Sequence, residues 1–175
     1  MRIPSIIRQD GEYKASIAAL AEQLSAKTPL PIVINGLSGG SADAYLVEAV
    51  GEARLASRAP VVVFVGNDAE RERVTSLLLA WGIDARQFKP RDLIFHNVSA
   101  SCDIDRERLS VLLSVRHAEC DAVVTTPSTA LGYTMPRAML DECGALLTVG
   151  TEISRDSLCD KLVGQIGRAS CRERV

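Results

Sequence analysis

The sequence predicts an α/β fold with a doubly wound, mainly parallel sheet, and three observations support this prediction. Short apolar runs of strand length alternate along the chain with segments of helical periodicity. A turn rich in glycine joins the first of these runs to a helix. Aromatic residues make up only 4% of the 175 residues while hydrophobic residues make up 47%, so the core must be aliphatic, as in buried parallel sheets.

The first third of the chain predicts a helix, a strand, a glycine-rich turn and a second helix. Residues 12–25 have the i, i+3, i+4, i+7 spacing of an amphipathic helix, with apolar residues at Ile17, Leu20, Ala21 and Leu24. Leu30–Ile34 is a short apolar run typical of a strand, and Asn35–Ser41 forms the turn. Ala42–Ser57 follows as a helix whose apolar face holds Leu46, Val47, Val50 and Ala53.

The middle of the chain predicts two further strands around one helix. Pro60–Val65 is a continuous apolar run, as expected of a strand that is buried on both faces. Gly66–Asp68 supplies a turn and a helix cap, so Ala69–Trp81 is predicted to be a helix, which Gly82 ends. Ala85–Phe88 is then a short strand.

The remainder of the chain continues the same alternation. Residues 91–102 lack periodicity and predict a loop, which leads into a helix over Asp103–Val115 with an acidic cap. Ala122–Thr125 is a short buried strand. Three more elements are predicted after it: a helical turn at Pro136–Cys143, a strand at Ala145–Val149, and a helix that Ser154 caps and that runs to Val163. This order indicates a parallel sheet with right-handed crossovers.

The glycine-rich turn carries the strongest chemical signal. A working phosphate loop has the pattern G-x-x-x-x-G-K-S/T between a strand and a helix, because its glycines, lysine and hydroxyl bind phosphates and Mg²⁺. If Gly36 is the first glycine of the pattern, Ser41 stands in the place of the last one. Ala42 then replaces the lysine, and Asp43 replaces the hydroxyl residue. The helix dipole favours Asp43 by roughly 0.3–1 kcal/mol, but its carboxylate repels a triphosphate.

These departures predict a vestigial phosphate loop that is kept for structure and holds no cofactor. An alternative is that backbone N–H groups alone bind a phosphate or sulfate at this helix N-terminus. We expect no catalytic residue and no metal ligand in the chain. The residues of the vestigial loop are Gly36, Gly39, Gly40, Ser41, Ala42 and Asp43.

Composition argues against several other classes of protein. The formal net charge of −2 gives no sign of a basic nucleic-acid surface. No apolar run reaches the ~18–20 residues of a membrane helix, and the N-terminus lacks the apolar core of a signal peptide, so we expect a cytoplasmic protein with no membrane partner. The cysteines form no C-x-x-C pair, which indicates reduced, structural thiols at Cys102, Cys120, Cys143, Cys159 and Cys171.

Three groups of polar residues are interpreted as structural. Asp141–Glu142 follows a predicted helical turn instead of the buried strand that a Walker B pair requires, so we expect a solvated acidic face. His96 and His117 have no cysteine or carboxylate nearby at metal-binding spacing. A charged cluster has the charge order that helix electrostatics favour and is not expected to be catalytic; it consists of Asp103, Asp105, Arg106, Glu107 and Arg108.

Two further patterns leave alternatives open. Ser38 lies in a segment that fits the G-x-S-x-G pattern of a hydrolase nucleophile, with one of the two histidines as a nominal partner. A hydrolytic or small-molecule-binding α/β domain that uses the Gly36–Ser41 turn is therefore an alternative. Thr125–Pro127 follows a buried strand at its carboxyl end, where doubly wound sheets place ligands. Because no basic residue follows before Arg137, DNA contact there is a minority interpretation.

Taken in order, five motifs resemble the N-terminal UvrB-homology module of the bacterial transcription-repair coupling factors (Mfd). The motifs are GLSGGSADAYLVEAV, APVVVFV, FKPRDLIFHNVSASCDIDRERLSVL, DAVVTTPSTAL and LLTVGTEISRDSLCDKLV, and the resemblance covers residues 12–164. The related protein UvrB has an intact phosphate loop and a tyrosine-rich β-hairpin. This chain has Ala42 and Asp43 instead, and no tyrosine between Arg91 and Cys102, which favours the coupling factor over a UvrB paralogue.

The resemblance implies a domain similar to UvrB domain 1a, followed by the start of a domain 2 that recruits UvrA in nucleotide excision repair and helps to hold the motor inactive. It implies that this chain alone is non-catalytic. The full-length protein of that family is an ATP-dependent DNA translocase that displaces stalled RNA polymerase. ATP, Mg²⁺, DNA and RNA polymerase bind its downstream domains. A UvrB paralogue is kept as an alternative.

The expected organisation of the chain has four parts. Residues 1–28 are a helical lead-in, and residues 29–143 are the α/β domain with the degenerate phosphate loop. Residues 144–164 are the truncated start of a second, α+β domain, similar to the UvrA-binding one. Residues 165–175 resemble the in-frame translation of a sequencing adaptor and are interpreted as an artefact.

Overall fold

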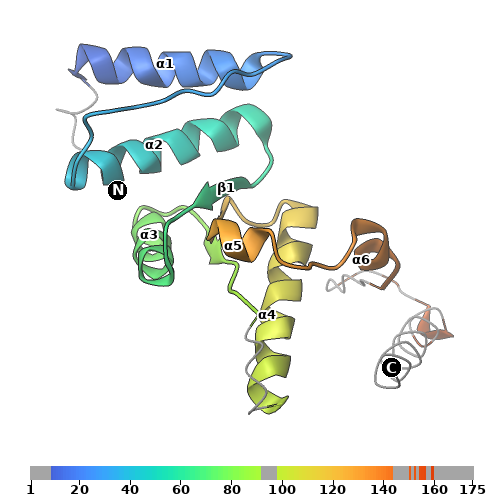
Figure 1. The fold of residues 1–175 in the computed structure, drawn as a ribbon. Helices are drawn as coiled ribbons and strands as arrows, with labels where there is room; N and C mark the ends of the chain where they lie inside the picture. Colours follow the sequence, from blue (N-terminus) through green and yellow to red (C-terminus); the bar gives the residue numbers. More distant parts are fainter. Residues whose placement is uncertain are drawn as a thin grey trace. The chain divides into compact units, whose positions relative to one another are not determined.

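The computed structural model describes residues 9–91 and 98–143, together with residues 150, 152, 154–156 and 159. The chain divides into two compact units, Met1–Gly132 and Tyr133–Val175. The predicted α/β class is confirmed. Figure 1 shows the elements, which are α1 (Gly11–Ser25), α2 (Gly40–Ser57), β1 (Val61–Phe64), α3 (Asp68–Ala80), β2 (Ala85–Gln87), α4 (Val98–His117), β3 (Ala122–Thr125), α5 (Pro127–Ala130) and α6 (Arg137–Cys143).

A parallel sheet of three strands, in the order β1-β3-β2, organises the described part of the first unit. Val61 of β1 and Ala85 of β2 both align with Ala122, so the central strand is the last of the three in sequence. Parallel neighbours require crossover connections, which the helices supply. The strands predicted around residues 61–64, 85–87 and 122–125 are confirmed, and so is the parallel arrangement.

Helices cover both faces of β3, all four residues of which are buried. Ala122 and Val124 belong to a core cluster that includes Val47 of α2 and Leu78 of α3. Val123, which points to the opposite face, packs in a second cluster with the side chains of Phe88, Val111 and Cys120. Alternation of side chains along the strand therefore gives two cores, as in a sheet with helices on both sides.

The strand predicted at Leu30–Ile34 is wrong. Residues 29–35 belong to no sheet, and Val33 is 77% exposed. Pro29 and Pro31 have no N–H group to donate, which makes the start of this segment a poor partner for a ladder of hydrogen bonds. The segment lies instead beside α1, where the Leu30 N–H donates to Oε1 of Gln23 at 2.8 Å.

Two helix boundaries also differ from the prediction. The loop predicted over residues 91–102 ends earlier, because α4 begins at Val98 and Asp103 does not cap it. Asp103 lies inside the helix and pairs with Arg106 at 3.4 Å. Helix α2 also begins earlier than predicted, at Gly40 instead of Ala42. After β3 the structure adds a short helix, α5, which Thr126 caps and Pro127 begins. The expected strand at 145–149 lies outside the described residues, and so do most of the expected helix 154–163, His96 and the tail 165–175.

Across the part of the chain that the structure describes, no helix is long and apolar enough to cross a lipid bilayer.

Candidate functional site

The glycine-rich turn leads into α2 through two glycines with left-handed backbone. Gly36 has φ +86° and Gly39 has φ +53°, a region that residues with a side chain rarely adopt. The Ser41 hydroxyl donates to the carbonyl of Ser38 at 2.8 Å and accepts the Ser38 N–H at 3.1 Å. The Ser41 N–H also donates to the Ser38 carbonyl, at 3.2 Å. Two backbone donors of the turn, the N–H groups of Ser38 and Ser41, are thus used within it.

Asp43, in the first turn of α2, is paired across the fold with Arg73 of α3. One guanidinium nitrogen of Arg73 lies 2.8 Å from Oδ1 and 2.9 Å from Oδ2 of the carboxylate. This hydrogen bond and the charge of Asp43 raise the pKa of Arg73. At the position where a phosphate loop would hold Mg²⁺, the chain therefore holds an internal carboxylate–guanidinium pair. The remaining predicted loop residue, Ala42, contributes no charge.

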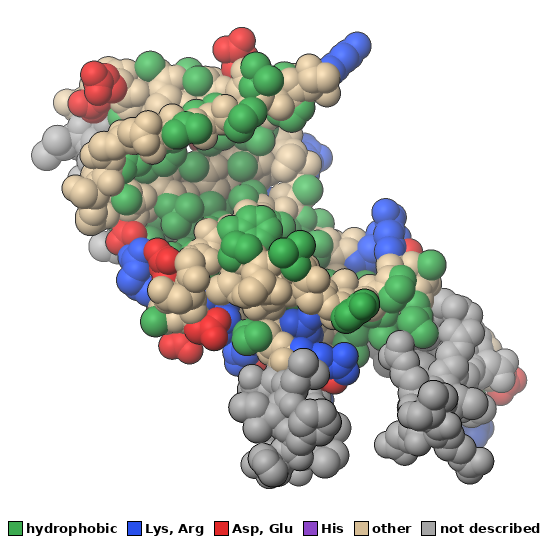
Figure 2. Space-filling view, viewed as in Figure 1, with side chains coloured by type: hydrophobic (Ala, Val, Ile, Leu, Met, Phe, Trp, Pro, Cys, Tyr) green, Lys and Arg blue, Asp and Glu red, His purple; other side chains and the backbone are tan. Residues whose placement is uncertain are grey.

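A cavity of about 610 Å³, the α1–α2 cavity, adjoins this turn. The first turns of α1, the extended segment Ile32–Leu37 and the first turns of α2 form its walls. Its apolar lining comes from Ile32, Val33, Ile34 and Leu37. In Figure 2, apolar side chains gather along the extended segment and over the region of α2 beneath it, and the surface between them is hollowed. The apolar run that was predicted as a strand is thus used to line a cavity.

The polar lining of the α1–α2 cavity is acidic and aromatic. Asp10 and Glu12 contribute carboxylates, and none of the described residues that line it is basic. Tyr13 and Tyr45 pack edge to face, with ring centroids 5.7 Å apart and planes at 87°. Tyr45 is 8% exposed, and its hydroxyl has no hydrogen-bond partner in the described chain. Buried hydroxyls are nearly always bonded, so this one is notable.

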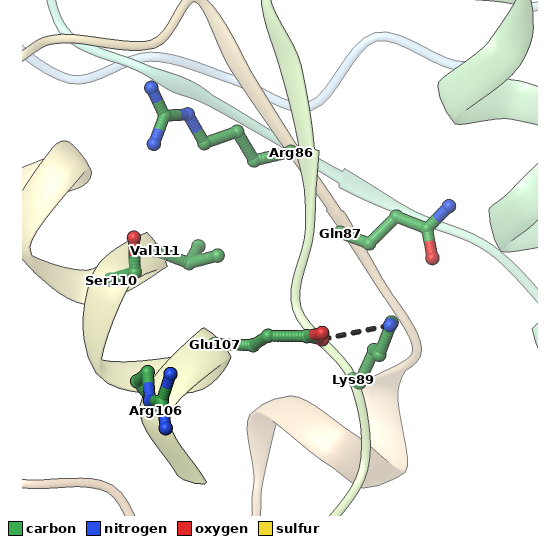
Figure 3. A pocket seen from close by; sticks show the side chains of 7 residues that line it. All are labelled: Arg86, Gln87, Lys89, Arg106, Glu107, Ser110 and Val111. Carbon is green, nitrogen blue, oxygen red and sulfur yellow. Dashed lines mark ion pairs between the residues drawn. The ribbon is translucent and has the colours of Figure 1, made fainter. Parts of the chain in front are cut away.

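A second hollow, the β2–α4 groove, lies on the other side of the sheet, with a volume of about 480 Å³. Figure 3 shows its side chains, which come from β2, the residues after it and α4: Arg86, Gln87, Lys89, Arg106, Glu107, Ser110 and Val111. Lys89 pairs with Glu107 at 2.8 Å, as the dashed line in Figure 3 marks. The Arg86 guanidinium donates to the Ser114 hydroxyl at 2.6 Å. The groove is basic, but its charges are engaged with neighbours.

Arg108 anchors the strand end that borders the β2–α4 groove. It is 7% exposed, its guanidinium lies 4.0 Å above the Phe88 ring, and it donates to the Lys89 carbonyl. Burial lowers the pKa of Arg108. Its neighbour Asp105 pairs with Arg91 at 2.8 Å. Of the charged residues at positions 103–108, Arg108 is the one that is buried, and it packs against Phe88.

The carboxyl end of β3 is closed by its own hydroxyls. Thr125 is 2% exposed and donates to the Phe88 carbonyl at 3.1 Å. The hydroxyls of Thr126 and Thr129 lie 2.8 Å apart in a buried pair. The hydroxyls of Thr125 and Thr126 are therefore bonded within the chain, while Pro127 is exposed, and DNA contact at Thr125–Pro127 stays a minority interpretation.

The remaining polar residues considered in the sequence are far from the glycine turn along the sequence. Asp141 is on α6 and is exposed, with Arg137 at 3.8 Å, which agrees with a solvated acidic face. His117 is the exposed last residue of α4. Cys120 and Cys159 are free thiols. Among the described residues, no group of three or more histidine, cysteine, aspartate or glutamate side chains is arranged to hold a metal ion.

The nucleophile pattern at Ser38 lacks its structural context. A nucleophile elbow requires a strand directly before the serine. Here the preceding residues belong to no sheet, and Ser38 is exposed. The hydroxyl that forms hydrogen bonds within the turn is that of Ser41, and its partners are the backbone N–H and carbonyl of Ser38.

Three residues that form the main contacts of these sites were not identified from the sequence: Arg73, Tyr45 and Arg108. Arg73 is separated from Asp43 by 30 residues, and no local pattern links them. Tyr45 is next to the predicted apolar face of α2, and its burial comes from packing against α1. Arg108 could have been found, because Ile104 and Val111 precede and follow it at helical spacing on an inward face.

No family model matches the chain, and no curated protein or solved structure matches it either.

Proposed function

We propose that the chain is the non-catalytic N-terminal module of a transcription-repair coupling factor, a cytoplasmic protein of nucleotide excision repair. In this proposal the module positions partners and restrains a motor, and it neither binds nor hydrolyses ATP. The proposal rests on the ordered motifs over residues 12–164 and on one observation in the glycine turn. That observation is the pairing of Asp43 with Arg73 beside an uncharged Ala42.

The chemistry of the turn argues against a nucleotide ligand. A triphosphate needs donors and positive charge, and a phosphate loop supplies both through its backbone and its lysine. In this turn the N–H groups of Ser38 and Ser41 already have partners, and Arg73 is held by a carboxylate. A nucleotide would have to break these contacts and approach the charge of Asp43. The arrangement fits a structural connection between the extended segment and α2.

The partners follow from the same proposal. UvrA would bind a second domain that begins near residue 144. RNA polymerase, DNA, ATP and Mg²⁺ would bind domains downstream of this chain, and the α/β unit would contact the motor within the full-length protein.

The experiment is a calorimetric titration of the chain with Mg-ATP. We expect no saturable binding, and we expect none with Asp43→Asn, because Ala42 supplies no cation and the turn donors stay engaged. Gly39→Val is the matched variant, since a side chain at φ +53° is strained and disturbs the turn. Tight Mg-ATP binding that Gly39→Val abolishes would overturn the proposal and favour a UvrB paralogue.

A further inference from the structure

We propose that the α1–α2 cavity binds a small organic ammonium ion that carries a hydrogen-bonding group. The cavity, at about 610 Å³, lies within the range of roughly 300–1,000 Å³ that is usual for small-molecule sites. It combines apolar walls with a few polar groups, as such sites do. This inference does not depend on the proposed function, because it concerns a different ligand.

The charge of the cavity selects a cation. Asp10 and Glu12 line it, and no lysine or arginine is among its described lining residues. The N-termini of α1 and α2 oppose this charge, since each is equivalent to roughly +0.5 of an elementary charge. Together they contribute about +1 against the two carboxylates. The cavity stays acidic, so phosphates and carboxylates are disfavoured.

The aromatic lining selects an organic cation over a metal ion. Tyr13 and Tyr45 contribute two rings at 87° to each other, and perpendicular rings are two walls of the kind of cage that holds alkylammonium groups. Ile32, Ile34 and Leu37 provide the apolar surface that the alkyl groups of such a ligand would contact. A bare metal ion would gain little from these walls and would lack a full set of oxygen ligands.

The Tyr45 hydroxyl is a second, independent indication of a ligand. It belongs to a side chain that is more than nine-tenths buried, at the cavity, and it has no partner in the described chain. A buried hydroxyl without a partner is unfavourable, and a bound molecule with a hydroxyl or an N–H group would satisfy it. The ligand class is therefore an ammonium ion with a polar group within reach of Tyr45.

The test uses choline as the probe and 3,3-dimethylbutan-1-ol, its uncharged isostere, as the control ligand. Binding is followed by calorimetry and by the NMR signals of the Ile32 and Ile34 methyl groups. We expect saturable choline binding with local methyl shifts, and binding of the isostere that is at least about tenfold weaker. Equal affinities for the two ligands, or no binding of choline, would overturn the proposal.

Two pairs of variants locate the site. Glu12→Gln should weaken choline binding by about threefold or more, whereas Glu22→Gln, on the same helix but outside the cavity lining, should leave it unchanged. Tyr45→Phe should weaken choline binding while the fold, followed by circular dichroism, is retained. If Glu12→Gln and Glu22→Gln behave alike, or if inorganic phosphate produces the same methyl shifts, the site is not a cation site and the inference fails.

Discussion

The two hollows of the α/β unit treat polar groups in opposite ways. In the β2–α4 groove, the Lys89 ammonium has Glu107 at 2.8 Å and the Arg86 guanidinium has the Ser114 hydroxyl at 2.6 Å. In the α1–α2 cavity, two carboxylates share a space without a basic lining residue, and the Tyr45 hydroxyl has no partner in the described chain. Lys89 and Arg86 of the groove thus have partners within the chain, whereas the Tyr45 hydroxyl of the cavity has none in the described chain.

This difference shows that unmet hydrogen-bonding capacity is a better indication of a ligand site than charge alone. A basic groove attracts attention because positive charge suggests an anionic partner. Two of its cations, Lys89 and Arg86, however, already have partners at 2.8 Å and 2.6 Å, which an anion would have to displace or share. A buried hydroxyl without a partner is unfavourable in the free protein. A ligand that forms a hydrogen bond with this hydroxyl removes that cost in free energy.

The largest effect we expect concerns the base of the groove, where Arg108→Ala should destabilise the fold by about 2–3 kcal/mol. The substitution removes the stacking of the guanidinium on Phe88 and its charged hydrogen bond to the Lys89 carbonyl. Arg106→Ala is the matched control, because its side chain is 81% exposed and should matter by less than about 0.5 kcal/mol. Urea unfolding followed by circular dichroism measures both.

Equal, small losses in Arg108→Ala and Arg106→Ala would break the comparison. They would mean that Arg108 does not hold the strand end that borders the groove. A large loss in Arg108→Ala alone supports the interpretation of the groove as a packed face.

Much of the sheet could be predicted from the sequence, because burial on both faces leaves a local mark. Ala122–Thr125 is a continuous apolar run ending in a small polar residue, and all four residues are buried. A helix cap was expected within Gly66–Asp68, and Asn67 supplies it, since its side chain accepts the Glu70 N–H at 2.8 Å. The positions of these elements could be predicted because they depend on residues that are close in sequence and on the apolar run of a strand that is buried on both faces.

The site could be predicted only in part, because pairing depends on distant residues. The apolar run Leu30–Ile34 signals contact with other apolar groups, but not whether the partner is a strand or a helix. The weakness of Ala42 and Asp43 as phosphate ligands was visible in the sequence. The partner of Asp43, by contrast, is on α3, and the environment of Tyr45 is set by α1. No periodicity encodes these tertiary contacts.

The second effect concerns the cavity, where Tyr45→Phe should stabilise the free protein by about 1 kcal/mol. The phenylalanine keeps the ring packed against Tyr13 and removes a buried hydroxyl that has no partner in the described chain. Tyr133→Phe is the control, because Tyr133 is 97% exposed. Thermal and urea unfolding of both variants measure the change. A destabilised Tyr45→Phe would show that the hydroxyl is bonded and that the two hollows do not differ in this respect.

The effect that is smallest at neutral pH concerns the thiol of Cys120, which tests whether the side of the sheet that bears the groove is closed to solvent. Cys120 is 1% exposed in the cluster with Phe88 and Val111 beside the groove, and burial raises its pKa. The folded state therefore holds the proton more tightly than the unfolded state does. Its stabilising contribution is complete below the unfolded pKa of about 8.5 and is lost as the pH rises through the higher folded value.

We expect the free energy of unfolding to fall more steeply above about pH 8.5 in the parent chain than in Cys120→Ala, by at most about 1.4 kcal/mol per pH unit. Iodoacetamide should modify Cys120 at neutral pH only as fast as the fold opens. A cysteine placed in the cavity by Ser16→Cys, in a chain whose native cysteines are replaced by serine, should react without unfolding, since Ser16 lines the open hollow. Identical pH dependences in the parent and in Cys120→Ala, or rapid alkylation of Cys120, would show that the side of the sheet bearing the groove is as open as the cavity.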